Sequence, residues 1–196
     1  MILNYFDYYL IAINIIGFVL FVINTLLYTY TADKQVDNIL TIVSIIGGSA
    51  GILLAIILID RKPSKEYMMS RVFVVCVFII QFILLLIIKG YIATDLTFAF
   101  WDFFSRHKLL IVYLVIINFV TFAAFAVDKI AAIERRSRIR VITLLGLAFA
   151  GGSFGALAAM YVLRHKTRVD YFTVGIPLII LMQTVLLFYI MNAAWK

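Results

Sequence analysis

The sequence predicts an all-α polytopic membrane protein whose six transmembrane helices form two inverted three-helix repeats. Three observations predict this fold. Of the 196 residues, 65% are hydrophobic and 14% are charged, with a mean hydropathy of +1.12, whereas soluble domains are about 45–50% apolar and about 25% charged. Long apolar stretches alternate with short charged segments, and the two halves of the chain match each other. This composition excludes a soluble enzyme, a nucleic-acid-binding module and a disordered tail.

The expected spans are each close to the ~20 apolar residues that cross the hydrocarbon core of a bilayer. They are residues 9–29, 39–59, 72–88, 109–127, 141–163 and 172–192. The third is the shortest, but its one strongly polar residue is Gln81, and Arg71 and Lys89 at its ends can snorkel to the headgroups. The N-terminus has no Lys or Arg before its first apolar run, so we expect the first helix to be retained rather than cleaved.

Residues 89–108 link the two halves, and in them Phe98, Phe100, Trp101, Phe103 and Phe104 are interleaved with Asp95 and Asp102. Aromatic residues flanked by charge are typical of the headgroup boundary, so an interfacial helix is expected. A re-entrant segment is the alternative interpretation. The chain therefore divides into a first repeat at residues 1–88, this aromatic linker, and a second repeat at residues 109–196.

The halves align without a gap when the chain is shifted by 104 residues, and the matches fall on unusual residue types. Tyr9, Leu10 and Asn14 fall on Tyr113, Leu114 and Asn118, Gly47-Gly48-Ser49-x-Gly51 falls on Gly151-Gly152-Ser153-x-Gly155, and Lys62 falls on Lys166. If the linker does not cross, three spans per half place the second repeat upside down relative to the first. For an N-in, C-in topology, ten Lys and Arg residues fall on the cytoplasmic side and seven on the external side, which favours that orientation.

Gly47 and Gly51 are four residues apart, as are Gly151 and Gly155, a spacing that lets helices approach closely in lipid. We therefore expect these glycines to pack helices, with the lining of a path as the alternative. A nucleotide-binding loop is rejected, because a P-loop needs a preceding strand and a following Lys-Ser/Thr pair.

Asn14 and Asn118 lie inside the first span of each repeat, where an amide without partners costs about 2–7 kcal/mol. They form either a helix-to-helix hydrogen bond or a polar pair that lines a permeation path.

Charged residues gather at two span ends of the second half. Asp128 and Lys129 end the fourth span, and Arg164, His165 and Lys166 begin where the fifth ends. The carboxylate can pair with Lys129 or with a neighbouring helix end, or relay a proton. The basic run suits a lipid phosphate or an anionic solute, or anchors the protein at the membrane surface. The candidate substrate-binding residues are Asn14, Asn118, Asp128, Lys129, Arg164, His165 and Lys166.

The chemistry of these residues favours binding over catalysis. His165 can act as an acid or base near neutral pH, but no Ser or Cys nucleophile stands nearby at a diagnostic spacing. His107 and His165 are the two histidines of the chain, so neither a multi-histidine metal site nor a cofactor is expected.

Four motifs between Tyr113 and about Tyr189 carry a resemblance to a known family. They are Asn118-x-x-Thr121-Phe122, Asp128-Lys129, Gly151-Gly152-Ser153-x-Gly155-Ala156, and Arg164-His165-Lys166-Thr167 followed by Phe172. On these motifs the second half resembles the small bacterial membrane family catalogued as domain of unknown function 1294. The first half looks like a degraded copy, with Asn24-Thr25 and Arg61-Lys62-Pro63-Ser64 at the positions of the second and fourth motifs. The resemblance implies a membrane location and a small helical unit, and it implies that any chemistry remains in the second half.

Transport or channel activity is the leading functional expectation, because inverted repeats with polar residues near the midplane recur in transporters. An anionic solute or a lipid headgroup is the expected ligand, and membrane lipids are the expected partners. The alternatives are a membrane assembly or regulatory protein and an enzyme that modifies lipid headgroups. Six spans are few for a wide pore, which favours a homodimer or a narrow path. The expected location is the inner (plasma) membrane of a bacterial cell.

Overall fold

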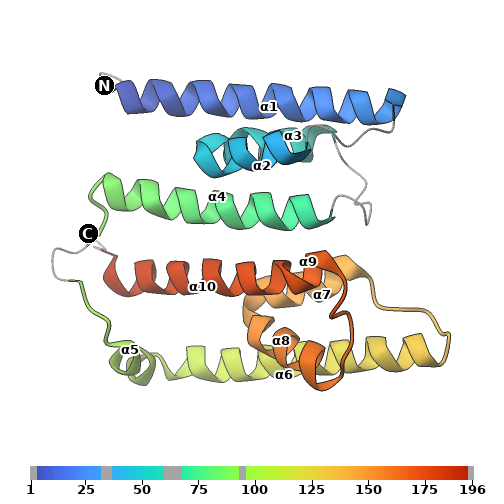
Figure 1. Cartoon of the computed structure of the whole chain (residues 1–196). Helices are drawn as coiled ribbons and strands as arrows, with labels where there is room; N and C mark the ends of the chain where they lie inside the picture. The colour runs from blue at the N-terminus through green and yellow to red at the C-terminus, as the bar shows by residue number, and fades with distance from the viewer. Residues whose placement is uncertain (1–3, 32–36, 60–67, 93–95, 194–196) are drawn as a thin grey trace. The chain divides into compact units, whose positions relative to one another are not determined.

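The computed structural model of the chain describes residues 4–31, 37–59, 68–92 and 96–193, and every regular element in them is a helix (Figure 1). The chain divides into two compact units, Met1–Phe82 and Ile83–Lys196, here called unit 1 and unit 2. The helices are α1 Tyr5–Thr31, α2 Asp37–Val43, η1 Ser44–Gly48, α3 Ser49–Ile59, α4 Met68–Ile88, α5 Phe100–Arg106, α6 Lys108–Ile133, α7 Val141–Leu147, η2 Ala148–Gly152, α8 Ser153–Val162, α9 Asp170–Thr173 and α10 Gly175–Asn192.

Six helical stretches are long and apolar enough to cross a membrane. They are Tyr5–Leu27, Asn38–Ile59, Met68–Ile88, Lys108–Ile133, Val141–Val162 and Asp170–Asn192. The six apolar stretches expected from the sequence are therefore confirmed as helices, and several such helices indicate a membrane protein. The fourth stretch continues past its expected end at residue 127, because Asp128 and Lys129 both find polar partners within unit 2.

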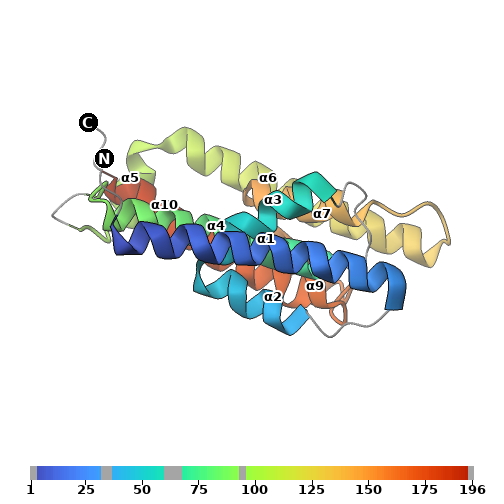
Figure 2. The same cartoon turned by 90° about the horizontal axis from the view of Figure 1, so that it is seen from above.

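In unit 1 the second apolar stretch is broken in its middle. Gly47 has a φ of +126°, a backbone conformation that glycine adopts without steric cost. Figures 1 and 2 show α2 and α3 as two arms that diverge from this break toward the C-terminal end of α1. The α3 arm runs alongside α1 in the same direction, since Gly51 lies against the backbone of Asn14 and Ile52 lies against Gly17. The stretch is therefore a hairpin of two half-helices.

Unit 2 contains the same kind of break, at Gly151 with a φ of +113°. Both ends of its hairpin lie beside the C-terminal part of α6 (Figure 1). The backbone N–H of Ile139, just before α7, donates to Asp128 at 3.0 Å, and Lys129 Nζ donates to the carbonyl of Leu163, just after α8, at 2.7 Å. The ten residues of α8 span about 15 Å, half the ~30 Å hydrocarbon core. The α7–η2–α8 hairpin therefore has the shape of a re-entrant segment.

These paths differ from the straight helices expected at residues 39–59 and 141–163. Length and composition do not distinguish one straight helix of 22 residues, such as Val141–Val162, from the two arms of a hairpin. Within each unit the hairpin returns to the end from which it started, while α1 and α4, or α6 and α10, run between the two ends (Figures 1 and 2).

The linker folds onto unit 2. Asn192 Oδ1 accepts the N–H of Thr97 at 2.7 Å, and Asn192 Nδ2 donates to the Thr97 carbonyl at 3.1 Å. Phe98 and Phe188 stack with their ring centroids 5.2 Å apart. These contacts position α5, a seven-residue helix in which no residue is buried. The expected helix in the linker is present, and its place at a membrane interface stays a prediction.

Candidate functional site

The break in unit 2 is held by polar side chains from α6 and α10. Tyr113 Oη donates to the Ala150 carbonyl at 2.6 Å, and Asn118 Nδ2 donates to the Gly151 carbonyl at 2.9 Å. Gln183 Nε2 donates to two further carbonyls of the same turn, at 2.8 and 3.1 Å. The end of a half-helix leaves carbonyls without intrahelical partners, and in lipid each of them needs an internal donor. These three side chains supply the donors.

Asn118 joins α6 to both arms of the hairpin. Its Nδ2 also donates to the Leu114 carbonyl at 2.8 Å, and its Oδ1 accepts the N–H of Gly155 at 2.6 Å. Gln183 is engaged in the same way, because its Oε1 accepts the hydroxyl of Ser153 at 2.5 Å. Both amides therefore use their hydrogens and their oxygen within unit 2. For Asn118 these bonds correspond to the helix-to-helix hydrogen bond, one of the two roles that the sequence left open.

Unit 1 has the corresponding set of bonds around its own break, with Asn14 in the place of Asn118 and Gln81 in the place of Gln183. The bonds run from Tyr9 Oη to the Ile46 carbonyl at 2.6 Å, from Asn14 Nδ2 to the Gly47 carbonyl at 3.0 Å, from the Gly51 N–H to Asn14 Oδ1 at 2.7 Å, from Gln81 Nε2 to the Ser44 and Ile45 carbonyls at 2.7 and 2.8 Å, and from the Ser49 hydroxyl to Gln81 Oε1.

The four predicted glycines have two different roles. Gly47 and Gly151 supply the positive φ of the breaks. Gly51 and Gly155 supply close approach, because a Cβ at either position would lie 1.9 or 2.1 Å from a backbone oxygen of α1 or α6. The spacing of four predicts one continuous packing face, but the break at the first glycine of each pair divides that face.

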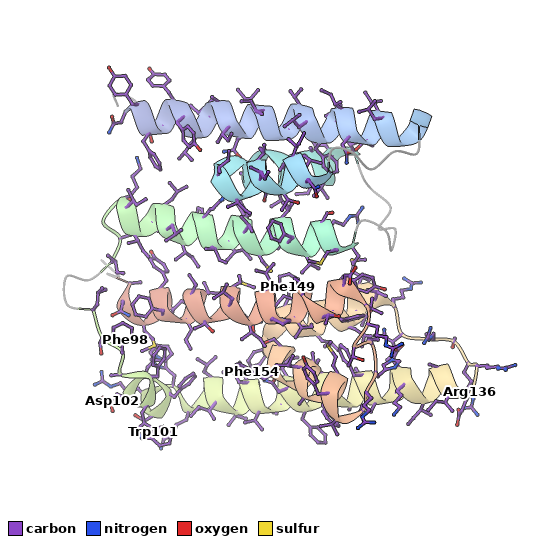
Figure 3. The ribbon with its side chains drawn as sticks, viewed as in Figure 1. Phe98, Trp101, Asp102, Arg136, Phe149 and Phe154 are labelled. Carbon is purple, nitrogen blue, oxygen red and sulfur yellow. The ribbon has the colours of Figure 1, made fainter. Side chains whose placement is uncertain are left out.

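A groove of about 990 Å³ lies in unit 2 beside the tip of the hairpin. It is lined by α5, the first half of α6, η2, the start of α8 and the last part of α10, and most of these side chains are aromatic or aliphatic. Its polar side chains are Asn118, Gln183 and Thr184. Figure 3 shows Phe154 of the lining on α8 and Trp101 of the lining on α5. The groove therefore has an apolar wall and a floor made by the broken helix.

A buried ion-pair cluster lies at the opposite end of α6 from α5. Asp128 is 0% exposed, and its Oδ2 lies 2.9 Å from both His165 Nε2 and Lys166 Nζ. Its Oδ1 accepts the Ile139 N–H at 3.0 Å. Lys166 Nζ also lies 4.7 Å from the centroid of the Phe172 ring, within the range of a cation–π contact. The cluster fastens the two loops that flank the hairpin to α6.

The structure brings together some of the predicted binding residues and separates others. Asp128 takes its partners from the neighbouring helix end, while Lys129 caps the carbonyl of Leu163. Arg164 has a φ of +47° and an exposed side chain. Lys166 is paired with the Asp128 carboxylate. The side chains of Arg164, His165 and Lys166 therefore do not all face one bound anion.

Sequence reasoning missed the roles of Tyr9, Tyr113 and Gln183. The available signal was that Gln81 and Gln183 are isolated amides within apolar spans, which require partners. Arg61 and Lys62, the first-half counterparts of the basic run, lie outside the described residues.

Comparisons with known proteins agree with the resemblance seen in the sequence. The family model described as "Protein of unknown function (DUF1294)" matches residues 118–172. The chain is 33% identical over 75 residues to the uncharacterized protein YsdA of Bacillus subtilis (strain 168), and this alignment covers 38% of the chain and 84% of YsdA. No solved structure matches the chain. The residues matched by the family model include Asn118, Gly151 and the whole Asp128–His165–Lys166 cluster. The chain therefore belongs to the DUF1294 family.

Proposed function

We propose that this protein is a small membrane transport or channel-like protein built from two copies of one helical unit in the same orientation. The two-copy proposal is supported by the matching bonds around the two breaks, which recur at a shift of 104 residues along α1 and α6. It is also supported by YsdA, because 75 residues make up 84% of that protein, so one unit of this chain is about as long as the relative.

The proposed topology places the hairpin ends of both units on the cytoplasmic side of a bacterial plasma membrane. Residues 89–107 carry four charges, which disfavours a span there, so the proposal starts both units from the same side. The chain then has 13 Lys and Arg residues on the side of the hairpin ends and four on the other. The thirteen are Lys34, Arg61, Lys62, Lys65, Arg71, Lys129, Arg135, Arg136, Arg138, Arg140, Arg164, Lys166 and Arg168. The positive-inside rule then places both termini outside, the reverse of the N-in, C-in expectation, which assumed straight second spans.

The observation that carries the transport proposal is the groove that ends at the tip of a broken helix. Non-helical backbone at membrane depth is tolerated where it is buried in protein or lines a cavity, and discontinuous helices form the substrate sites of many transporters. In unit 2 the hairpin extends along α6 from Asp128 to Tyr113, and the groove lies beside its tip, toward the α5 end. A ligand in this groove would face the hairpin tip, with the basic end of the unit beyond it. An anionic solute or a lipid headgroup is the proposed ligand class, and of the two the apolar lining of the groove favours a lipid. A homodimer stays a prediction.

A flux assay with matched glycine variants tests this proposal. The full chain is reconstituted into vesicles and assayed with inorganic phosphate and with a fluorescent phosphatidylglycerol. Gly151→Ala strains the break, because its φ is +113°, and we expect it to lower flux at least tenfold in folded protein. Gly146→Ala, in the same hairpin but with no neighbouring heavy atom within 4 Å, should leave flux unchanged. Equal flux in both variants would refute a role for the break, and no flux with either probe together with a constantly co-purifying partner would favour an assembly protein.

An enzyme acting on lipid headgroups is the second candidate, and the 2.9 Å contact between Asp128 and His165 favours it. A carboxylate that orients a histidine is half of an acid–base pair. Turnover of a phospholipid that His165→Gln abolishes, in protein that keeps its helical content, would support this candidate over transport.

A further inference from the structure

We propose that the groove of unit 2 binds one hydrocarbon chain of an anionic phospholipid, whose phosphate lies at Arg106 and Lys108. The inference rests on the proposed function in one respect, since it takes the groove as the ligand-receiving site.

The lining of the groove favours hydrocarbon over a polar solute. No charged side chain is among the described residues that line it. The hydrogens of Asn118 and Gln183 are already donated to backbone carbonyls, and the Thr184 hydroxyl donates to the Ile180 carbonyl at 2.9 Å. A polar solute entering the groove would lose hydrogen bonds to water and find few free donors, which is costly. An alkyl chain loses none.

The length of the groove corresponds to one leaflet of a bilayer. Along α6 its lining extends from Leu110 to Phe122, which is about 18 Å at 1.5 Å per residue. Half of the ~30 Å hydrocarbon core is about 15 Å. The hairpin packs along α6 from Tyr113, which donates to the Ala150 carbonyl at its tip, to Lys129, which donates to the Leu163 carbonyl at its end. One acyl chain that starts at the α5 end and fills this length would therefore lie against the hairpin tip and extend past it.

The α5 end of the groove carries the charge that a phospholipid phosphate requires. Arg106 and Lys108 stand between the groove-lining Phe104 and Leu110, and both side chains are exposed. The groove-lining aromatics of α5 suit the level of the headgroups, and cations there attract anionic lipid. Figure 3 shows Asp102 at this end, and Arg136 at the other end of unit 2. Two cations against one neighbouring carboxylate leave an excess of positive charge for the phosphate.

Photocrosslinking tests the position of the chain. The full protein is reconstituted in phosphatidylcholine vesicles with phosphatidylglycerol that carries a diazirine near the end of one acyl chain. We expect labelled peptides from the groove-lining parts of α6 and α10. Val115→Trp should lower labelling at least fivefold, because Val115 lines the groove, whereas Ile116→Trp is the matched control, since Ile116 is similarly exposed on α6 but lies outside the lining.

The headgroup contact is tested by lipid preference. Replacing Arg106 and Lys108 together by Gln should lower the preference for phosphatidylglycerol over phosphatidylcholine about tenfold, since charge-assisted hydrogen bonds are lost. Arg136→Gln, at the other end and paired with Glu134 at 3.1 Å, should leave the preference unchanged. Absence of label on α6 and α10, or equal labelling of the two Trp variants, overturns the lipid inference even if flux is present. Groove labelling in a protein without flux keeps the lipid inference and refutes transport.

Discussion

The ion-pair cluster of unit 2 leads to the strongest prediction about stability. Asp128 is 0% exposed, and the side chains of His165 and Lys166 are each 12% exposed. Asp128→Asn keeps the shape of the side chain and removes the negative charge that lies 2.9 Å from the largely buried Lys166 ammonium. Removing one partner of a buried pair typically costs about 3–5 kcal/mol, so we expect the free energy of unfolding to fall by about this amount.

A double substitution separates the lost pair from the charge left behind. In Asp128→Leu with Lys166→Met both ionic groups are replaced by apolar ones, and such replacements are often neutral. The double variant should therefore be more stable than Asp128→Asn alone. Glu134→Gln is the matched control, because it breaks the pair with Arg136, whose side chains are 45% and 77% exposed, and an exposed pair is worth about 0–1 kcal/mol.

The measurement is reversible unfolding in mixed detergent micelles, followed by circular dichroism and by the emission of the aromatic residues. The prediction also requires that the hairpin loosens, so proteolysis in the loop at residues 134–140 should accelerate in Asp128→Asn. A loss below about 1 kcal/mol for Asp128→Asn, equal to that of Glu134→Gln, would show that the cluster is hydrated and would refute the reasoning.

Three further predictions concern the path of the chain and the packing at the breaks. Cysteines placed at Arg135 and Arg168 in a Cys76→Ser background should both react with an impermeant maleimide from the cytoplasmic side, because both lie at the hairpin ends; reaction from opposite sides would restore a straight span. Gly155→Ala should destabilise the protein by more than the ~1–3 kcal/mol usual for overpacking, since its Cβ would lie 2.1 Å from a backbone oxygen; thermal unfolding measures the loss. Asn118→Leu should cost about 0.6–2 kcal/mol, and an unchanged midpoint of unfolding would contradict the interpretation that Asn118 joins the hairpin arms to α6.

The sequence was informative about which residues matter and much less so about the path between them. Hydropathy locates the apolar helices because burial in lipid demands an uninterrupted apolar run, and that demand is the same for a straight helix and for a hairpin. The information that distinguishes them is the Gly47-Gly48 and Gly151-Gly152 pairs. Their spacing matches a helix-packing motif, and only the positive φ of the first glycine reveals the turn.

The charge partners of Asp128 were harder to predict for the same reason. A straight fifth span would put Arg140 and Arg164 on opposite sides of the membrane, so Ile139 and His165 would not contact one carboxylate. With a hairpin, both ends of the segment return to α6, and Asp128 meets both. The distribution of Lys and Arg between the two sides becomes less even in the proposed hairpin topology than with straight spans.

The two units differ in what holds their hairpins, and this difference has a physical basis. Both breaks use neutral donors, which satisfy carbonyls without burying a charge. At the hairpin ends unit 2 has Asp128, while unit 1 has Asn24 at the matching position, 8% exposed. A buried carboxylate is stable only with its cations in place, whereas a buried amide needs only hydrogen-bond partners. Loss of Lys166 or His165 therefore weakens the compensation of the Asp128 charge, whereas an Asn at the same position would tolerate that loss. Among the described residues, the hairpin of unit 2 is held by a buried ion-pair cluster, and this hairpin also forms the floor of the groove.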